Sequence, residues 1–342
     1  MALTVILPEN GYSTVLRGQL EAALDGIPHT YVGNADHLSS THLLFAVALD
    51  ACGCNEGYYR ILRRLRGAPL LLEGCTAALV VTGHGEFYTK SVARTLALAA
   101  NMAGCALIGR PLVEATGSLQ NFRTQAELSG LNEAAAYAAA LRDLAERLDG
   151  HAPLPPIRHL VALHASSRAT SNTLALWDLV RRNLPDIEIR EFGLRNGTVM
   201  DCIGCSYSAC LHYGENGGCF YGGVMTEEVF PAVLDCDALV MLCANYNDAL
   251  SANLTACVNR LTALYRRTRF YDKRLYGLVV SGYSGGDLVA QQLISALNMN
   301  KSFYLPPRFC LMETANDAGS LLKLPGVAGR AAAFARQMTC TF

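Results

Sequence analysis

Short apolar runs alternate along the chain with stretches in which apolar residues recur every three or four positions. The runs at 42–49, 77–83 and 238–245 are typical of strands buried on both faces of a parallel sheet. Amphipathic stretches such as 91–103 and 251–266 predict helices between such strands. The alternation therefore predicts an α/β fold with doubly wound parallel sheets.

The same patterns predict the remaining elements. Residues 302–309 are expected to form an edge strand, because their two prolines exclude a central position. The other expected strands lie at 4–9, 29–33, 105–109, 160–163, 187–192 and 275–283, and the other expected helices lie at 13–24, 58–65, 131–148, 287–299 and 327–336.

A proline-rich segment, HAPLPPI at 151–157, separates two regions of similar pattern and predicts a linker. Residues 43–65 align by eye with 239–264, and residues 80–109 align with 279–305. We therefore interpret the chain as two copies of one domain, at 1–150 and 158–342. The copies differ between their second and third strands, where the first has only 34–41 and the second has an insert at 193–237.

Composition narrows the classes of function. The 342 residues are 51% hydrophobic and carry a net charge of −1, which leaves no electrostatic footprint for nucleic acid or an anionic membrane. No basic segment precedes an apolar stretch at the N-terminus and no apolar run approaches a membrane span, so we expect a cytoplasmic protein. Thirteen cysteines without an export signal indicate reduced thiols, some of which could bind metal.

The strand at 160–163 leads into a polar loop and then a helical pattern. Free backbone N–H groups at a helix start suit a phosphate, although the same residue types are also favoured as ordinary N-caps. The candidate phosphate contacts are Ser166, Ser167, Arg168, Ser171, Asn172 and Thr173.

The insert contains the most specific chemical motif of the chain. Its four cysteines, Cys202, Cys205, Cys210 and Cys219, are spaced x2, x4 and x8. Four thiolates suit an iron–sulfur cluster or a structural zinc ion. Packed thiols, or a redox pair at the Cys-x2-Cys motif, are the alternatives.

Four motifs in order, LHASSRATSNT, CIGC with further cysteines, ALVMLCANYNDALSANLTACVNRL and VVSGYSGG, resemble the NADPH-dependent FMN reductase and iron–sulfur flavoprotein group of the flavodoxin-like superfamily. The resemblance covers about residues 158–310. It implies two flavodoxin-like domains, each with a five-stranded parallel sheet of order 2-1-3-4-5. The chain departs from the family at His164 and Ala165, which replace Gly-Ser, and in its wider cysteine spacing.

The resemblance also implies that the loops after the third and fourth strands border the isoalloxazine ring, at the edge where such folds bind ligands. It implies that the cysteine insert covers the ring, and that a [4Fe-4S] cluster is held by the four cysteines. The implied ring contacts are Ala244, Asn245, Tyr246, Asn247, Asp248, Ser281, Gly282, Tyr283, Gly285 and Gly286.

These observations lead to the hypothesis of an FMN-dependent oxidoreductase that passes electrons from NAD(P)H to a small-molecule or protein acceptor. The alternatives are an iron–sulfur electron carrier with a ferredoxin-like partner, a non-catalytic flavodoxin-like binding protein and a zinc-stapled structural protein. The first copy has Glu9 in its loop and no arginine, so we expect it to have lost its flavin site. It would then act as a pseudo-partner within one chain, unless the chain forms a homo-oligomer. Its candidates to line the active site are Cys52, Cys54, His84, Glu86 and Tyr88.

Overall fold

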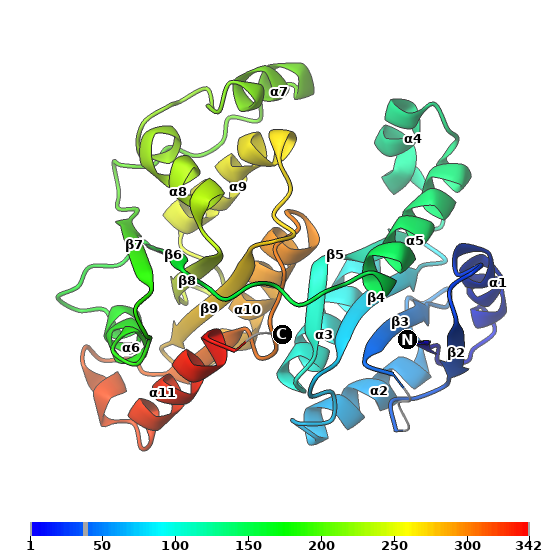
Figure 1. Cartoon of the computed structure of the whole chain (residues 1–342), viewed down its shortest axis with the longest axis horizontal. Helices are drawn as coiled ribbons and strands as arrows, with labels where there is room; N and C mark the ends of the chain where they lie inside the picture. Colours follow the sequence, from blue (N-terminus) through cyan, green and yellow to red (C-terminus); the bar gives the residue numbers. More distant parts are fainter. Residues whose placement is uncertain (1, 37–39, 341–342) are drawn as a thin grey trace. The chain divides into compact units, whose positions relative to one another are not determined.

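A computed structural model, which describes residues 2–36 and 40–340, contains two five-stranded parallel sheets (Figure 1). The first has the order β2-β1-β3-β4-β5 and the second the order β10-β9-β8-β6-β7. Read from the other edge, the second sheet repeats the order of the first. The chain therefore consists of two tandem flavodoxin-like domains, as the sequence predicted.

The first sheet consists of β1 (Leu3–Ile6), β2 (His29–Val32), β3 (His42–Ala48), β4 (Thr76–Thr82) and β5 (Ala106–Ala115). Five α-helices and a 3-10 turn accompany it: α1 (Ser13–Ala23), α2 (Glu56–Gly67), α3 (Thr89–Met102), η1 (Gln120–Phe122), α4 (Arg123–Ser129) and α5 (Glu133–Asp149).

The second sheet consists of β6 (His159–His164), β7 (Glu188–Gly193), β8 (Ala238–Ala244), β9 (Arg274–Ser281) and β10 (Cys310–Thr314). Its helices are α6 (Asn172–Arg181), α7 (Tyr207–Glu215), η2 (Met225–Val229), α8 (Phe230–Asp235), α9 (Ala252–Arg267), α10 (Gly286–Leu293), η3 (Ile294–Met299), η4 (Ser320–Lys323) and α11 (Val327–Met338).

The chain divides into two compact units, Met1–Ala152 with Pro306–Arg308, and Pro153–Leu305 with Phe309–Phe342. The division falls within the proline-rich segment. Within the parts that the structure describes, no helix has both the length and the apolar character needed to cross a bilayer.

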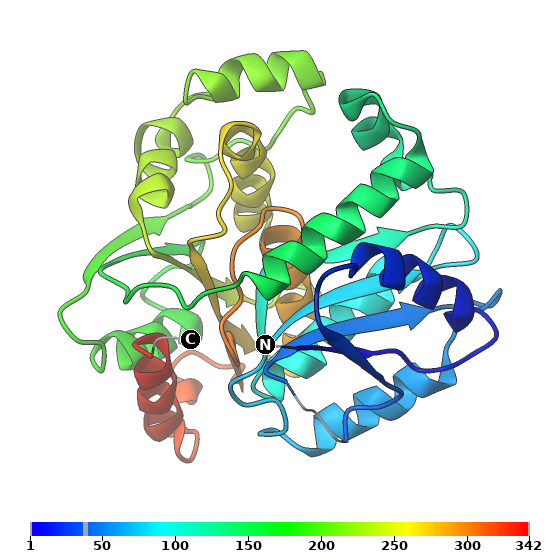
Figure 2. The same ribbon diagram turned by 45° about the vertical axis from the view of Figure 1, so that its right-hand side comes forward.

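Each sheet is covered on both faces, which explains its continuous apolar strands. In the first unit, α1 and α5 pack together on one side, and α2 and α3 pack together on the other (Figure 2). In the second unit, α6 and α11 close one core over β8 and β9, with Trp177 of α6 fully buried in it (Figure 1). The strand ends that carry the candidate loops are thereby held on a rigid base.

Three details differ from the sequence prediction. The edge strand is β10, which directly follows the segment at 302–309. That segment contributes only an isolated bridge at Tyr304, because Pro306 and Pro307 lack N–H groups and both Ser302 and Arg308 have positive φ angles. The second difference is that β5 continues past Gly109 through a register shift, and the third is that α4 was not predicted. The short segment at 34–41 lies partly outside the described residues.

Candidate functional site

The three candidate loops of the second unit begin at the same edge of one sheet. His164 at the end of β6 is in register with Leu242 of β8, and Ala244 of β8 is in register with Val280 of β9. Because parallel strands place their carboxyl ends together, the loops after β6, β8 and β9 share this edge. The predicted juxtaposition of the loops is therefore present.

The first loop leads into α6 with unused backbone donors. Ser171 is the N-cap, and its Oγ accepts from the N–H of Leu174 at 3.1 Å. In the described part of the chain, the N–H groups of Asn172 and Thr173 donate no hydrogen bond. Two free amides at a helix start form an arrangement that binds anions.

The side chain of Asn172 holds this loop in place. The Nδ2 of Asn172 donates to the carbonyls of Ala315 and Asp317, at 3.2 and 2.8 Å, and its Oδ1 accepts from the N–H of Gly319. Asn172 therefore ties the loop to the segment after β10 through its side chain, and only its backbone amide faces no partner. Ser166 is buried, whereas Ser167 is exposed.

Arg168 points toward carboxylates in this structure. Its guanidinium pairs with Glu191 of β7 and, at 3.4 Å, with Asp178. Glu191 also accepts a hydrogen bond from the Nε1 of Trp177 at 2.9 Å. Sequence analysis did not identify Glu191, because nothing in the strand pattern shows that β7 places a carboxylate beside this loop.

His164, at the end of β6, is buried next to the same carboxylate. Its Nε2 lies 3.5 Å from Glu191, and its Nδ1 accepts from the N–H of Ser166 at 3.3 Å. Burial lowers the pKa of His164, against the opposing effect of Glu191. The imidazole is therefore neutral near pH 7, and its acceptor nitrogen fixes the start of the loop.

Hydrogen bonds from Asn245 join the second and third loops. Its Nδ2 donates to Ser281 Oγ at 3.1 Å and to the carbonyl of Ser284 at 2.9 Å. Its Oδ1 is buried and has no partner among the described residues. A buried orphan acceptor at this edge fits a ligand that carries an N–H group.

The second loop closes as a tight hairpin. Tyr246 and Ala249 form an antiparallel bridge, and Asn247 and Asp248 between them have φ angles of 51° and 59°. Gly285 lies against this hairpin with a φ of +84°, and a Cβ there would be 2.0 Å from Asp248 Oδ1. The two loops therefore fit together only with glycine at 285.

Two tyrosines are exposed at this edge, Tyr246 at 56% and Tyr283 at 81%. Such exposed rings at a sheet edge offer flat apolar surfaces to a planar ligand. Gly282 is close to Asn316, whose Nδ2 lies 3.4 Å from the Tyr283 hydroxyl. Asn316 belongs to the segment after β10 that Asn172 also holds, and sequence analysis did not predict this segment as part of the site.

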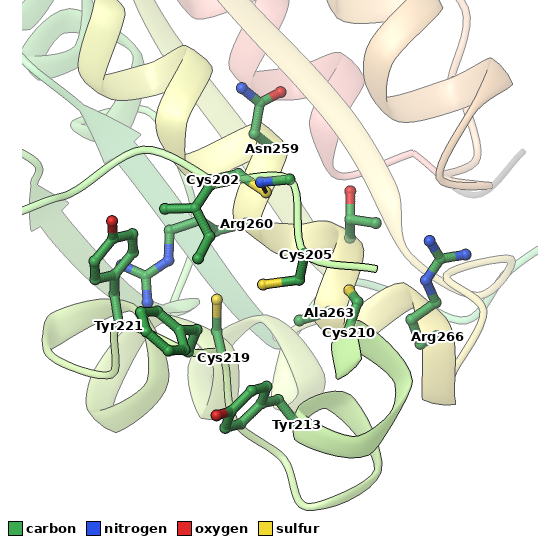
Figure 3. A pocket seen from close by; sticks show the side chains of 14 residues that line it. Cys202, Cys205, Cys210, Tyr213, Cys219, Tyr221, Asn259, Arg260, Ala263 and Arg266 are labelled. Carbon is green, nitrogen blue, oxygen red and sulfur yellow. Dashed lines mark hydrogen bonds between the residues drawn. The ribbon is translucent and has the colours of Figure 1, made fainter. Parts of the chain in front are cut away.

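The four insert cysteines line one cavity of about 350 Å³ (Figure 3). Figure 3 shows the side chains of Cys205 and Cys219 pointing toward one another, with Cys202 and Cys210 on the same cavity. Residues of α9, among them Asn259, Arg260 and Arg266, form the opposite wall. The structure therefore brings together all four predicted metal ligands, which come from the loop before α7, from α7 and from the loop after it.

This cavity lies along α9. Asn253, near the start of α9, bonds Leu194 at 2.8 Å, and Asn259 bonds Asp201 at 3.0 Å, so the insert runs along the helix before it reaches Cys202. Residues from Asn259 onward lie about 10 Å or more from the start of α9 at about 1.5 Å per residue. None of the three loops is among the residues that line this cavity, and the expectation that the cysteine insert covers the flavin ring stays a prediction.

The four thiols, as the structure describes them, do not form a site for a single metal ion. Four sulfurs on one zinc ion lie about 3.8 Å apart, because each Zn–S bond is about 2.3 Å. Across residues 2–36 and 40–340, no three His, Cys, Asp or Glu side chains are placed to hold one metal ion. The sulfurs instead surround a cavity, and no disulfide joins any of the thirteen cysteines. An iron–sulfur cluster held by these four cysteines therefore stays a prediction.

In the corresponding loop of the first unit, the side chains of Asn10 and Ser13 are hydrogen-bonded within the loop. Ser13 Oγ accepts from the N–H of Asn10 at 3.1 Å and donates to the Asn10 carbonyl at 2.8 Å. The Nδ2 of Asn10 donates to Ala48, and its Oδ1 accepts from Tyr12. These bonds pair the side chains of Asn10 and Ser13, whereas in the described part of the chain the N–H groups of Thr14 and Val15 at the start of α1 donate no hydrogen bond. Asn10, Ser13 and Thr14 line a pocket that also contains the carboxylate of Glu9.

The five first-unit candidates also lie in loops after strands. Cys52 and Cys54 are exposed in the loop after β3, and Glu86 accepts from the N–H of Ser118 at 2.8 Å. The ring of His84 lies 5.4 Å from that of Tyr12, and Tyr88 packs against Gly53. Their contribution to an active site remains a prediction.

Sheet order and loop placement define a protein of two tandem flavodoxin-like domains with a candidate ligand edge on the second. Comparison with protein families adds that residues 158–317 match the family model of NADPH-dependent FMN reductases. This range includes all three loops and the four cysteines. A search of curated proteins finds no match.

Solved structures with a similar fold include three oxidoreductases. An NADH:FMN oxidoreductase, EMOB, in its apo form, is 18% identical over 53% of this chain and 88% of its own, with a TM-score of 0.37. An NAD(P)H:quinone oxidoreductase from Methanothermobacter marburgensis is 16% identical over 53% and 96%, with a TM-score of 0.41. An azoreductase from Bacillus anthracis is 13% identical over 52% and 99%, with a TM-score of 0.39. The family match, and not these likenesses, supports a flavin-dependent oxidoreductase.

Proposed function

We propose that this chain is an FMN-dependent oxidoreductase that takes electrons from NAD(P)H and passes them to a small-molecule or protein acceptor. The observation that carries the proposal is that the FMN reductase match at 158–317 falls on three loops that share one sheet edge. FMN bound there would supply the hydride-accepting chemistry. The protein would bind FMN, orient it and adjust its reduction potential.

Each loop has a distinct part in this proposal. The free amides of Asn172 and Thr173 would hold the phosphate at the start of α6, with Ser166, Ser167 and Arg168 beside it. The orphan Oδ1 of Asn245 would accept from an N–H on the ring. The exposed ring of Tyr246 or Tyr283 would cover the ring system, and glycines 282, 285 and 286 would admit it closely.

The test uses the full chain purified without oxygen. Flavin content is measured first, and reduction of the bound flavin by NADH or NADPH is then followed at its visible absorbance band by stopped flow. We expect saturable flavin reduction by a nicotinamide alone. A chain that binds FMN but is reduced only by a ferredoxin-like protein would support the electron-carrier alternative. A chain that binds FMN and accepts electrons from neither donor would be a non-catalytic binding protein, and a chain that binds no FMN would overturn the proposal.

We also propose that Cys202, Cys205, Cys210 and Cys219 hold an iron–sulfur cluster of the [4Fe-4S] type. The convergence of four thiols on one cavity supports this, since packed thiols would fill the space between them. Such a cluster would supply single-electron transfer. Iron and acid-labile sulfide assays test it, with Cys219→Ser expected to lose iron and Cys52→Ser, an exposed cysteine of the first unit, expected to keep it. Stoichiometric zinc without sulfide would overturn the cluster in favour of a structural zinc site.

We propose finally that the first unit binds no flavin and serves as a pseudo-partner of the second. The carboxylate of Glu9 beside this loop, which would repel a phosphate, and the paired side chains of Asn10 and Ser13 support this. We expect one FMN per chain and a monomer in solution if the two units replace the usual dimer. Two FMN per chain would contradict the loss of the first site, and a stable homo-oligomer would contradict the pseudodimer.

A further inference from the structure

Two arginines line the cysteine cavity without a carboxylate partner: Arg260, which is buried, and Arg266, which is half-buried. Arg260 is 3% exposed, and its Nη2 donates to the carbonyl of Gly222 at 2.7 Å. Arg266 lies on the same wall, with its guanidinium 4.5 Å from the ring centre of Tyr207. In the described part of the chain, the Nε atoms of both arginines are buried and have no acceptor.

Nothing described near the cavity neutralises these charges. No salt bridge joins Arg260 or Arg266 to an acidic residue in the described structure, and Asp201 is occupied by Asn259 and by the N–H of Cys202. Buried cations without a counter-ion are costly, so this wall is built for an anion.

Four neutral thiols do not supply that anion, whereas four thiolates around a metal centre do. A thiolate-bound iron–sulfur centre is a net anion, and one added electron increases its negative charge by one without making or breaking a bond. Cations fixed beside it in a region of low dielectric stabilise the more negative state more than the less negative one. Arg260 and Arg266 therefore bias the centre toward reduction.

We propose that Arg260 and Arg266 are charge-compensating residues of the four-cysteine site and raise the reduction potential of the iron–sulfur centre held there. This inference rests on the cluster proposed above. Arg260 also has a positioning role, because its hydrogen bond to the carbonyl of Gly222 attaches the loop that contains Cys219 to α9. The charge and the hydrogen bond are separable by substitution.

The experiment is an anaerobic redox titration of the full chain, followed by electron paramagnetic resonance of the reduced centre. Arg260→Gln and Arg266→Gln each remove one charge from the cavity wall, and Arg260→Lys keeps the charge while losing the guanidinium geometry. Arg182→Gln removes an exposed charge at the end of α6 and serves as the matched control. The electron source is the titrating mediator, so the readout does not depend on enzymatic activity.

We expect each glutamine variant to lower the potential enough that the reduced-to-oxidised ratio at a fixed potential falls about tenfold, which is about 59 mV for one electron. Arg260→Lys and Arg182→Gln are expected to stay near wild type. If Arg260→Gln fails to fold, Arg266→Gln makes the same comparison.

The outcomes distinguish failure of this inference from failure of the cluster proposal on which it rests. Wild-type protein without iron and sulfide overturns the cluster, and the inference with it. A loaded cluster whose potential is unchanged in both glutamine variants overturns the inference alone. An Arg260→Lys variant with the same potential as Arg260→Gln would show that the hydrogen bond to Gly222, and not the charge, sets the potential, which also overturns it.

Discussion

The side-chain amide of Asn245 donates to the hydroxyl of Ser281 at 3.1 Å, and this bond joins the loops that follow β8 and β9. The same amide reaches the carbonyl of Ser284 at 2.9 Å. One residue therefore sets the distance between two loops, while its own Oδ1 stays buried and unpaired. The donor of Asn245 organises the site, and its acceptor is left for a ligand.

Replacing Asn245 by alanine is expected to weaken FMN binding about tenfold, equivalent to about 1.4 kcal/mol. The substitution removes both interloop hydrogen bonds and the orphan acceptor. Fluorescence titration of apoprotein with FMN measures the dissociation constant. Asn183→Ala is the control, because the Nδ2 of Asn183 donates to the carbonyl of Leu179 just after the end of α6, away from the three loops. Equal affinities for FMN in the two variants would contradict the proposed contact.

Glu191→Gln is expected to tighten FMN binding several-fold at low ionic strength and to leave riboflavin binding unchanged. Glutamine keeps an oxygen to accept from Trp177, but it removes the negative charge beside Arg168. Arg168 then offers more of its charge to a phosphate, which riboflavin lacks. The gain should shrink at high salt, since the Arg168 side chain is 47% exposed.

Parallel titrations of FMN and riboflavin at two salt concentrations measure this effect. Glu188→Gln is the matched control, as Glu188 lies on the same strand and its side chain is 67% exposed. An equal gain in affinity for both ligands would show that Glu191 acts on the shape of the loop and not on the phosphate.

The fold was predictable because buried strands and helices leave a clear pattern of apolar residues in the sequence. Runs such as 238–245 and 42–49 are apolar on both faces of the strand, and only a doubly covered parallel sheet uses such runs. The two domains and their sheet order followed from that pattern and from the family resemblance. The prediction of an edge strand at 302–309 was wrong because Ser302 and Arg308 have positive φ angles, which interrupt the extended backbone. The sequence does not show these angles.

The site was predictable only as far as loops follow strands. The loops after β6, β8 and β9 were located because each follows an apolar run. Glu191 was missed because its contact with Arg168 depends on the twist and register of β7, which the sequence does not show. The sequence also does not show where the cysteine cavity lies. Its position depends on the packing of α7 against α9, and no pattern in the sequence indicates that these two segments are in contact.

The buried His164 gives the second unit a pH-dependent stability. Burial lowers its pKa in the folded chain below the unfolded value of about 6.5, so the unfolded chain binds more protons between the two values. Its contribution to stability is complete above about pH 6.5 and is lost as the pH falls through the folded pKa. We expect His164→Asn, which keeps an acceptor for the N–H of Ser166, to flatten this loss.

Urea unfolding of wild type and variant, from pH 7.5 to 5, measures the effect as the difference between the two curves. His42 and His151 of the first unit also have lowered pKa values from burial and contribute equally to both proteins. His159→Asn, on the same strand but with its side chain 45% exposed, is the control. A pH dependence that is identical in wild type and His164→Asn would contradict the assignment.

The cysteine cavity depends on a close approach of α7 to α9 that only glycine permits. A Cβ at Gly214 would lie 2.3 Å from the backbone carbonyl oxygen of Ala263, so Gly214→Ala must push α7 away from α9. We expect a loss of about 1–3 kcal/mol in the free energy of unfolding, and faster maleimide labelling of Cys210 on the displaced helix. Gly218→Ala in the same insert is the control, since its Cβ would meet Tyr213 at an ordinary 3.6 Å. Matching labelling rates in the two variants would show that α7 is not held by this contact.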